Sequence, residues 1–172
     1  MKKIFFLPLL MLTVISLYGQ DASGKFNIGT GIGLGTEIET IGLGITGQYF
    51  ITNEIAVQGN LTIFFPNNEI DGVVDVTRRF SEINMNGVYY FDLESIVRPY
   101  ALAGINIGIV GVDFEPDDLF EDQSEGEIGL NLGGGVDLLV HEELTPFAQL
   151  KYAISDYDQL VIFIGVRYNF SN

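Results

Sequence analysis

The sequence predicts an all-β protein, and three observations support this prediction. The 172 residues include 21 glycines, and 12% are aromatic, a composition that disfavours helices. Apolar residues recur at every second position in one segment after another, whereas no segment after residue 20 has a period of 3.6. The residues between the apolar ones are mainly glycines, amides and a few charged side chains, so the two faces of each strand differ sharply.

The segment "GEIGLNLGGGVDLLV", residues 126–140, shows the pattern clearly. Ile128, Leu130 and Leu132 alternate with Gly129 and Asn131. Successive side chains of an extended strand point to opposite faces, so the apolar residues share one face. Glycine weakens a strand unless something packs closely against it. We therefore expect the polar face to be crowded.

The first four predicted strands cover residues 25–35, 41–51, 55–65 and 82–91. Each has one apolar parity: Phe26, Ile28, Ile32 and Leu34; Ile41, Leu43, Ile45, Tyr49 and Ile51; Ile55, Val57, Leu61, Ile63 and Phe65; and Ile83, Met85, Tyr89 and Phe91. The opposite parity carries glycines and polar residues such as Gln48, Gln58 and Asn84. Period-two alternation over about ten residues predicts a strand in each case.

The last four predicted strands cover residues 101–109, 126–140, 144–154 and 160–170. Their apolar parity comprises Ala101, Ala103, Ile105, Ile107 and Ile109; Ile128, Leu130, Leu132, Val136, Leu138 and Val140; Leu144, Ala148, Leu150, Tyr152 and Ile154; and Leu160, Ile162, Ile164, Val166, Tyr168 and Phe170. About eight strands of similar length therefore follow one another along the chain.

The connections between the predicted strands alternate in length. Residues 52–54, 92–98 and 141–143 are short connections, whereas residues 66–76 and 113–127 are long. Short periplasmic turns and long external loops are typical of a transmembrane β-barrel. The sequence thus predicts an eight-stranded antiparallel up-and-down transmembrane β-barrel over residues 21–172. Such a closed barrel pairs every backbone group between strands, with its apolar parity in lipid and its glycine-rich parity in a narrow lumen.

Residues 1–20 read as a signal peptide, with an uncleaved anchor as the alternative. Lys2 and Lys3 precede an apolar run over residues 4–17, and Gly19 follows it. The chain has no cysteine, which excludes disulfides and processing as a lipoprotein. A formal net charge of −15 argues strongly against nucleic-acid binding.

The chain contains four segments that are typical of one family of barrels: "RPYALAGINIGI", "GLNLGGGVD", "LTPFAQLKY" and "FIGVRYNF". On these segments it resembles the bacterial outer-membrane β-barrel family with OmpA/OmpX-like eight-stranded domains. The resemblance covers residues 24–170. The resemblance implies the outer membrane of a Gram-negative bacterium, contact with its lipid, and recognition of the last strand by the outer-membrane assembly machinery. That machinery reads an aromatic residue at the end of the strand. Phe170 fits this role, although Ser171 and Asn172 follow it.

Four charged residues, Glu82, Asp137, Lys151 and Arg167, lie on the parity that faces the predicted lumen. Counting from the periplasmic strand ends places Asp137 with Arg167 at a low level and Glu82 with Lys151 at a higher one. Charges in so narrow a lumen must be paired, because an unpaired buried charge costs about 3 to 5 kcal/mol. We therefore expect two ion pairs that plug the lumen and no stable ion conductance.

An acidic run occupies residues 113–127 and includes Asp113, Glu115, Asp117, Asp118, Glu121 and Asp122. Carboxylate oxygens at this density bind Ca²⁺ or Mg²⁺ in other proteins, but the spacing matches no EF-hand loop. The favoured interpretation is a solvated, self-repelling loop, with weak divalent-cation binding as the alternative and no firm metal site.

These observations favour a non-enzymatic outer-membrane barrel, with a structural role or an unidentified surface partner bound through acidic extracellular loops, and without a cofactor. His141, the only histidine, falls in a predicted periplasmic turn. A histidine-dependent site at the outer surface is therefore hard to build. Two alternatives remain: a lipid-modifying barrel enzyme, and a soluble periplasmic lipocalin-like barrel that binds a ligand in an apolar lumen.

Overall fold

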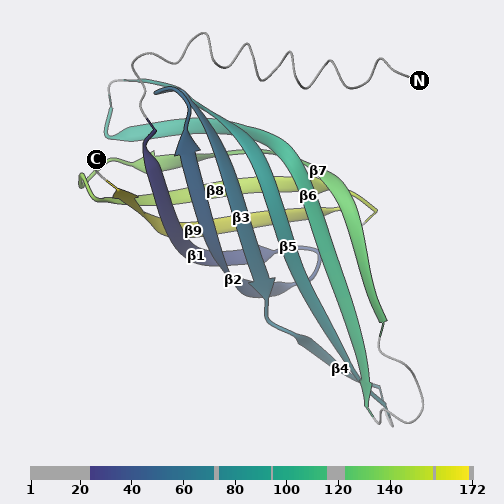
Figure 1. The fold of residues 1–172 in the computed structure, drawn as a ribbon. Coiled ribbons are helices and arrows are strands. Elements are labelled where there is room, and N and C mark those ends of the chain that lie inside the picture. Colours follow the sequence, from purple (N-terminus) through teal and green to yellow (C-terminus); the bar gives the residue numbers. More distant parts are fainter. Residues whose placement is uncertain (1–23, 72–73, 94, 116–122, 157, 171–172) are drawn as a thin grey trace, which may run out of the picture.

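The computed structural model describes residues 24–71, 74–93, 95–115, 123–156 and 158–170. Within these ranges the chain forms nine strands and no helix (Figure 1): β1 (Phe26–Gly35), β2 (Thr40–Phe50), β3 (Ile55–Phe64), β4 (Asn67–Asp71), β5 (Val74–Tyr90), β6 (Val97–Glu115), β7 (Gln123–Leu138), β8 (Leu144–Ile154) and β9 (Gln159–Phe170). The expected signal peptide at residues 1–20 lies outside the described residues, as do Asp117, Asp118, Glu121 and Asp122.

Eight of the strands close into an antiparallel barrel. Strand β1 pairs with both β2 and β9, and each later barrel strand pairs with its neighbour along the chain. Strand β3 pairs directly with β5, in a register that sets Ile55 opposite Tyr89. This pairing closes the barrel, while the short β4 forms a hairpin with β5 outside it. The predicted eight-stranded up-and-down barrel is thus confirmed.

The two faces of the barrel wall have opposite chemistry, as the alternation predicts. The outward face carries large apolar side chains such as Ile32, Met85 and Ile164, of which 56%, 61% and 60% of the surface is exposed. The inward face carries buried polar residues such as Asn84 and Asn131. A barrel in lipid needs this arrangement, because its exterior contacts acyl chains and its interior is closed off from them.

Three strands are longer than the expected ten residues or so, which corrects the predicted loops. Strands β5, β6 and β7 have 17, 19 and 16 residues. Most of the expected loop 66–76 therefore lies in β4 and β5, and both ends of the expected loop 113–127, including Asp113 and Glu115, lie in β6 and β7. These strands continue because their backbone groups still pair beyond the barrel, as Asp75 does with Glu115.

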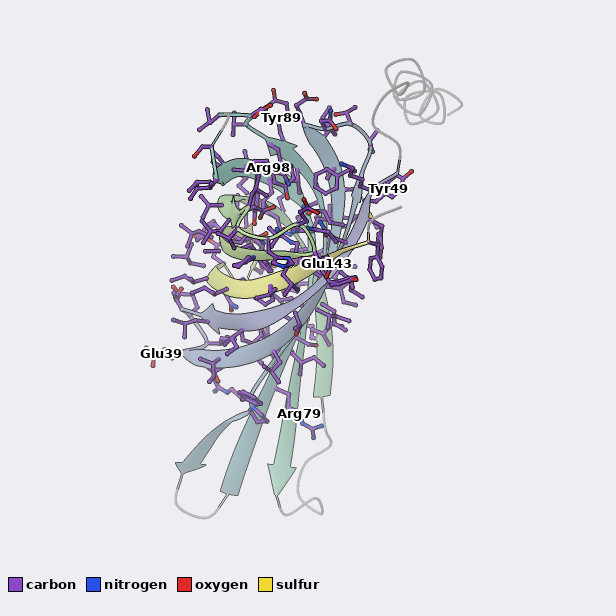
Figure 2. All side chains as sticks on the ribbon, turned by 90° about the vertical axis from the view of Figure 1, so that its left-hand side faces the viewer. Glu39, Tyr49, Arg79, Tyr89, Arg98 and Glu143 are labelled. Atoms are coloured by element: carbon purple, nitrogen blue, oxygen red, sulfur yellow. The ribbon has the colours of Figure 1, made fainter. Side chains whose placement is uncertain are left out.

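The extensions form a sheet that projects from one end of the barrel, at the lower right of Figure 1. We call it the arm and define it as residues 67–71, 74–80, 110–115 and 123–129. Figure 2 shows Arg79 toward this end, with Tyr89 and Arg98 toward the other. No helix in the described ranges is long and apolar enough to cross a membrane.

Candidate functional site

The lumen is the place where the fold gathers most of its polar side chains. All eight barrel strands contribute buried polar side chains that point inward: Asn27, Gln48, Gln58, Thr62, Glu82, Asn84, Asn86, Asn106, Asn131, Asp137, Gln149, Lys151 and Arg167. Because alternate residues of a strand face the same side, the sequence pattern itself brings these side chains into one space. They form two charged clusters linked by amides.

The first cluster joins Lys151 and Glu82 across the barrel. Lys151 Nζ lies 2.5 Å from Glu82 Oε2, and less than 5% of either side chain is exposed. Lys151 Nζ also donates a hydrogen bond of 2.8 Å to Asn84 Oδ1. Glu82 is on β5 and Lys151 on β8, which do not pair in the sheet, so this contact spans the lumen.

A ladder of amides surrounds this ion pair. Asn84 Oδ1 accepts hydrogen bonds from Asn106 Nδ2 at 2.7 Å and from Asn131 Nδ2 at 2.9 Å. Asn131 Nδ2 donates a further bond of 2.9 Å to Asn86 Oδ1. The ladder ties β5, β6 and β7 together on the lumen side. Buried amides linked in this way hold the charged pair in one geometry, because each amide has few other partners.

The second cluster joins Arg167 of β9 and Asp137 of β7. Arg167 Nη1 lies 2.5 Å from Asp137 Oδ1, and both side chains are almost completely buried. Arg167 Nη2 donates to the Tyr100 hydroxyl at 3.2 Å, and the Tyr90 hydroxyl donates to Asp137 Oδ2 at 3.2 Å. The Arg167 guanidinium also stacks 3.7 Å from the centre of the Phe147 ring. A guanidinium suits this place because its flat face packs on aromatic rings while its edge donates.

The structure thus brings together both pairs expected from the sequence, and it adds Arg98, which the sequence pattern does not predict, to the second pair. Arg98 Nη2 lies 3.5 Å from Asp137 Oδ2, and its guanidinium lies 4.2 Å from the centre of the Tyr90 ring. The sequence predicts a turn over residues 92–98, whereas β6 begins at Val97 and includes Arg98. The alternation pattern carries a sign of this role, because Arg98 stands two residues before Tyr100 and therefore lies on the same, inward-facing side of the strand.

Inward glycines make room for the large side chains of the lumen. A Cβ at Gly44 would lie 2.7 Å from the ring of Phe163, and a Cβ at Gly135 would lie 2.5 Å from the ring of Tyr100. Both distances are far below van der Waals contact. These glycines are therefore required for packing in the lumen.

The remaining candidates lie apart from the lumen. His141 is exposed in the connection between β7 and β8, where its Nδ1 accepts a hydrogen bond of 3.2 Å from the backbone N–H of Glu143. Among the described residues, no three His, Cys, Asp or Glu side chains lie close enough together to hold a metal ion. Asp113 and Glu115 are at the end of β6 in the arm.

Comparison with known proteins identifies one family. The family model described as "Outer membrane protein beta-barrel domain" matches residues 7–170. A comparison with curated protein sequences finds no match.

Several solved structures share the fold at low sequence identity. The attachment invasion locus protein Ail of Yersinia pestis, solved in complex with the heparin analogue sucrose octasulfate, is 17% identical with a TM-score of 0.64, covering 86% of this chain and 99% of its own. The outer membrane protein OprG of Pseudomonas aeruginosa is 18% identical with a TM-score of 0.67, covering 90% of this chain and 99% of its own. Neisserial surface protein A is 18% identical with a TM-score of 0.65, and the match covers 86% of this chain and 97% of the chain of that protein.

Proposed function

The chain belongs to the outer-membrane β-barrel family, and on that premise we propose that it is a non-enzymatic barrel with a plugged lumen. It is a protein of the Gram-negative outer membrane. In this proposal it acts as a structural element of the envelope or binds a surface partner through its acidic extracellular end. Water and ions do not pass through it.

One observation supports the proposal of a plugged lumen: two buried ion pairs and an amide ladder cross the barrel interior between strands that do not pair with each other. An eight-stranded barrel is only wide enough for side chains to fill. Here Lys151 reaches Glu82 from the opposite wall, and Arg167 makes contact with Asp137, Tyr100 and Phe147 at once. Opening a pore would require these buried charges to leave their partners, and breaking a buried ion pair costs several kcal/mol.

The proposed orientation places the arm outside the cell and the short turns in the periplasm. In outer-membrane barrels the short turns are periplasmic and the longer connections are extracellular. Epitope tags inserted at Asn68 and at Glu121 should therefore be labelled on intact cells, whereas a tag at Glu142 should be labelled only after permeabilisation. If only the Glu142 tag were labelled on intact cells, the proposed orientation would be wrong and the barrel would have the opposite one. The outer-membrane assembly machinery would read β9, whose Phe170 is exposed on the outer face.

The two alternative functions have less support. A lipid-modifying enzyme acting at the outer surface would need a base there, but His141 lies in a short turn between β7 and β8. A soluble ligand-binding barrel needs an apolar lumen and a polar exterior. The faces of this barrel are the reverse, with Lys151 inside and Met85 outside.

The ligand of the Ail complex does not suit this chain on charge grounds. Sucrose octasulfate is a polyanion, whereas this chain has a formal net charge of −15. Like charges repel over distances of about 10 Å at 0.1 M salt. We therefore expect no binding of sucrose octasulfate, which a titration of the refolded protein can check.

A planar-bilayer recording tests the plugged lumen. Refolded full-length protein should give no steady current across a wide range of voltages, while an established porin in the same bilayers verifies that channels would be detected. A Glu142→Gln variant, altered only at an exposed turn, serves as a matched control and should behave identically. Steady open-channel current from the unmodified protein would overturn the proposal.

A further inference from the structure

One edge of the arm carries no partner strand. Strand β7 pairs with β6 over its whole length, but β8 pairs with it only from Leu130 to Asp137. Residues 123–129, which we call the β7 edge, therefore pair with β6 on one side and with no other described segment on the opposite side. Figure 1 shows this part of β7 at the margin of the projecting sheet. In an antiparallel pair, backbone groups of alternate residues point away from the partner, so about half of the N–H and C=O groups here are open to another strand.

The neighbouring wall ends where the β7 edge begins. Strand β8 stops at Ile154, and the connection to β9 starts beside Gly129, because a Cβ at Gly129 would lie 2.8 Å from the Cβ of Ser155. Beyond this contact the sheet continues only on the β6 side of β7. A further strand that added to the β7 edge would thus lie in line with β8.

The β7 edge lacks most of the devices that keep strand edges from pairing. Proteins block such edges with bulges, proline, lysine, very short strands or a covering segment. The register of β7 with β6 has no bulge, and the segment "QSEGEIG" contains neither proline nor lysine. Its charged residues are two glutamates, Glu125 and Glu127. Two carboxylates repel acidic chains but attract basic ones, so they make the edge selective.

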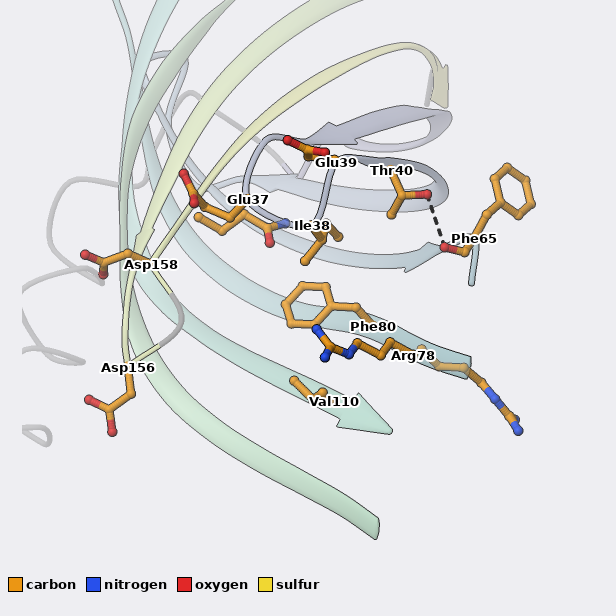
Figure 3. A pocket seen from close by; sticks show the side chains of 12 residues that line it. Glu37, Ile38, Glu39, Thr40, Phe65, Arg78, Phe80, Val110, Asp156 and Asp158 are labelled. Carbon is orange, nitrogen blue, oxygen red and sulfur yellow. Dashed lines mark hydrogen bonds between the residues drawn. The ribbon is translucent and has the colours of Figure 1, made fainter. Parts of the chain in front are cut away.

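Both glutamates lie on the side of the arm that faces the mouth of the barrel. Glu125 is exposed and Glu127 half-buried, and they share the inward parity of Asn131, whereas Ile128 lies on the outer face with 78% of its surface exposed. Val110, opposite Glu125 in the register with β6, lines a cavity of about 590 Å³ at the mouth (Figure 3). Side chains of an added strand would therefore have open space on the side of the two carboxylates.

We propose that the β7 edge binds an extended basic segment of another polypeptide by antiparallel strand addition. The open backbone groups of β7 pair with the added strand, and Lys or Arg side chains at alternate positions lie opposite Glu125 and Glu127. Strand addition of this kind takes its affinity from the main chain and its specificity from alternate side chains.

A second copy of the chain is a poorer occupant of the same edge. Pairing of two β7 edges would bring the glutamates of one copy next to those of the other, and like charges across a strand pair are destabilising. A chain with a formal net charge of −15 also repels its copies. The proposal deepens the role of a surface partner in the proposed function and rests on that function for the side of the membrane to which the arm points. It does not require a plugged lumen.

Four peptides separate strand addition from simple charge attraction. The basic probe, acetyl-Val-Lys-Thr-Lys-Thr-Thr-amide, places its two lysines opposite Glu127 and Glu125 when it pairs with residues 123–128. The second peptide has glutamates in place of the lysines. The third has the same composition as the probe but adjacent lysines, which point to opposite faces of a strand. The fourth is the probe with N-methyl groups on two successive residues, so that one blocked N–H faces β7 in either hydrogen-bonding pattern.

Each peptide is titrated into isotope-labelled full-length protein in micelles of an uncharged detergent and followed by two-dimensional NMR. We expect saturable shifts of the backbone amides of residues 123–129 with the basic probe. The peptide with adjacent lysines should bind about two- to fivefold more weakly, because one cross-strand charge pair is lost. The N-methylated probe keeps both charges and should not bind saturably, and neither should the acidic peptide.

Two variants test the residues that select the partner. Glu125→Gln and Glu127→Gln should each weaken binding of the basic probe about two- to fivefold, because each removes one cross-strand charge pair. Glu125 is exposed, so its variant also decides the question if Glu127→Gln does not fold. Glu54→Gln makes the same change in charge at an exposed position of the β2–β3 connection and should bind like the unmodified protein.

Several results would overturn the proposal. Equal binding of the N-methylated probe would show charge attraction without strand addition, and shifts confined to residues 67–71 would place the site at β4. Absence of saturable binding, tighter binding of the acidic peptide, or an affinity unchanged by both glutamate variants would refute it as well. Pairing of β7 between copies of the protein would assign the edge to a second copy.

The labelling of tags on intact cells keeps this test distinct from the test of orientation. Binding of the basic probe together with a Glu142 tag labelled from outside would refute the proposed orientation alone. The expected labelling without binding of the probe would refute the β7 edge as a docking site alone.

Discussion

Side chains alternate between the outward and the inward face along the whole of β5, but the polarity of the two faces differs between its barrel half and its arm half. In the barrel half, the outward Ile83 and Met85 are apolar and exposed, while the inward Glu82 and Asn84 are polar and buried. At the start of the arm, the outward Arg79 is charged and exposed. Its inward neighbour Phe80 is apolar and, together with Val110 of the neighbouring β6, lines a cavity at the mouth of the barrel.

The difference shows what the alternation reports. Period two indicates only that a segment is a strand, whereas the side on which the apolar residues lie indicates what surrounds it. In the barrel half, lipid bathes the outer face and polar residues pair inside. At the start of the arm, the charged Arg79 lies on the outward parity, whereas the apolar Phe80 and Val110 line a cavity at the mouth of the barrel. We infer that the change between Phe80 and Glu82 marks one edge of the hydrocarbon layer, the extracellular one in the proposed orientation.

The largest expected effect is on the barrel half, where charges are paired away from water. Asp137→Ala leaves the Arg167 guanidinium without its carboxylate partner, and we expect it to lower the free energy of unfolding by about 3 to 5 kcal/mol. Urea titrations of the protein folded into liposomes measure this change. The control Glu142→Ala, on an exposed turn, should be nearly neutral. A loss no larger than that of the control would show that the pair is not needed.

The next effect concerns the lipid face of the same half. Met85→Arg should cost about 2 to 4 kcal/mol, because an arginine near the bilayer midplane is costly on the outside of a barrel. Ile164→Arg, on the outer face of β9, should behave similarly. Liposome folding titrations give both values. Costs below about 1 kcal/mol at both positions would place these faces in water and remove the basis of the comparison.

A double-mutant cycle sharpens the account of the lumen. Asp137→Asn and Arg167→Gln each break the ion pair, so the double variant should be less destabilised than the sum of the single ones. Contacting residues in one network couple by about 0.5 to 3 kcal/mol. The same titrations supply the three free energies. Simple additivity would mean that the two side chains contribute independently.

The smallest effect is expected in the arm. Arg79→Leu changes an exposed position outside the hydrocarbon layer and should alter the free energy of unfolding by no more than about 0.5 kcal/mol. An equally small change for Met85→Arg would erase the contrast between the two halves. A loss of several kcal/mol for Arg79→Leu would show that the arm is not a solvated extension.

The sequence predicts the barrel well because lipid imposes one rule on every outward position. It also places Asp137 near Arg167, since counting residues from the strand ends approximates their height. It does not predict the length of β5 and β6, because in the arm the outward positions of the sequence no longer carry apolar residues. The alternation that identifies the barrel strands is therefore interrupted there. The cavity at the mouth of the barrel depends on how the β1–β2 and β8–β9 connections meet in space, which the alternation pattern does not report.

Spin labels at single cysteines along β5 test the central claim most directly. The chain has no cysteine of its own, so each variant carries one label. For protein in liposomes, two reagents report the surroundings of each label: oxygen, which dissolves in lipid, and a water-soluble nickel complex. We predict that labels at Ile83 and Met85 are accessible to oxygen and that a label at Arg79 is accessible to the nickel complex. A label at Asn84 should be accessible to neither. Equal accessibility at Met85 and Arg79, or a water-accessible label at Asn84, would contradict the account.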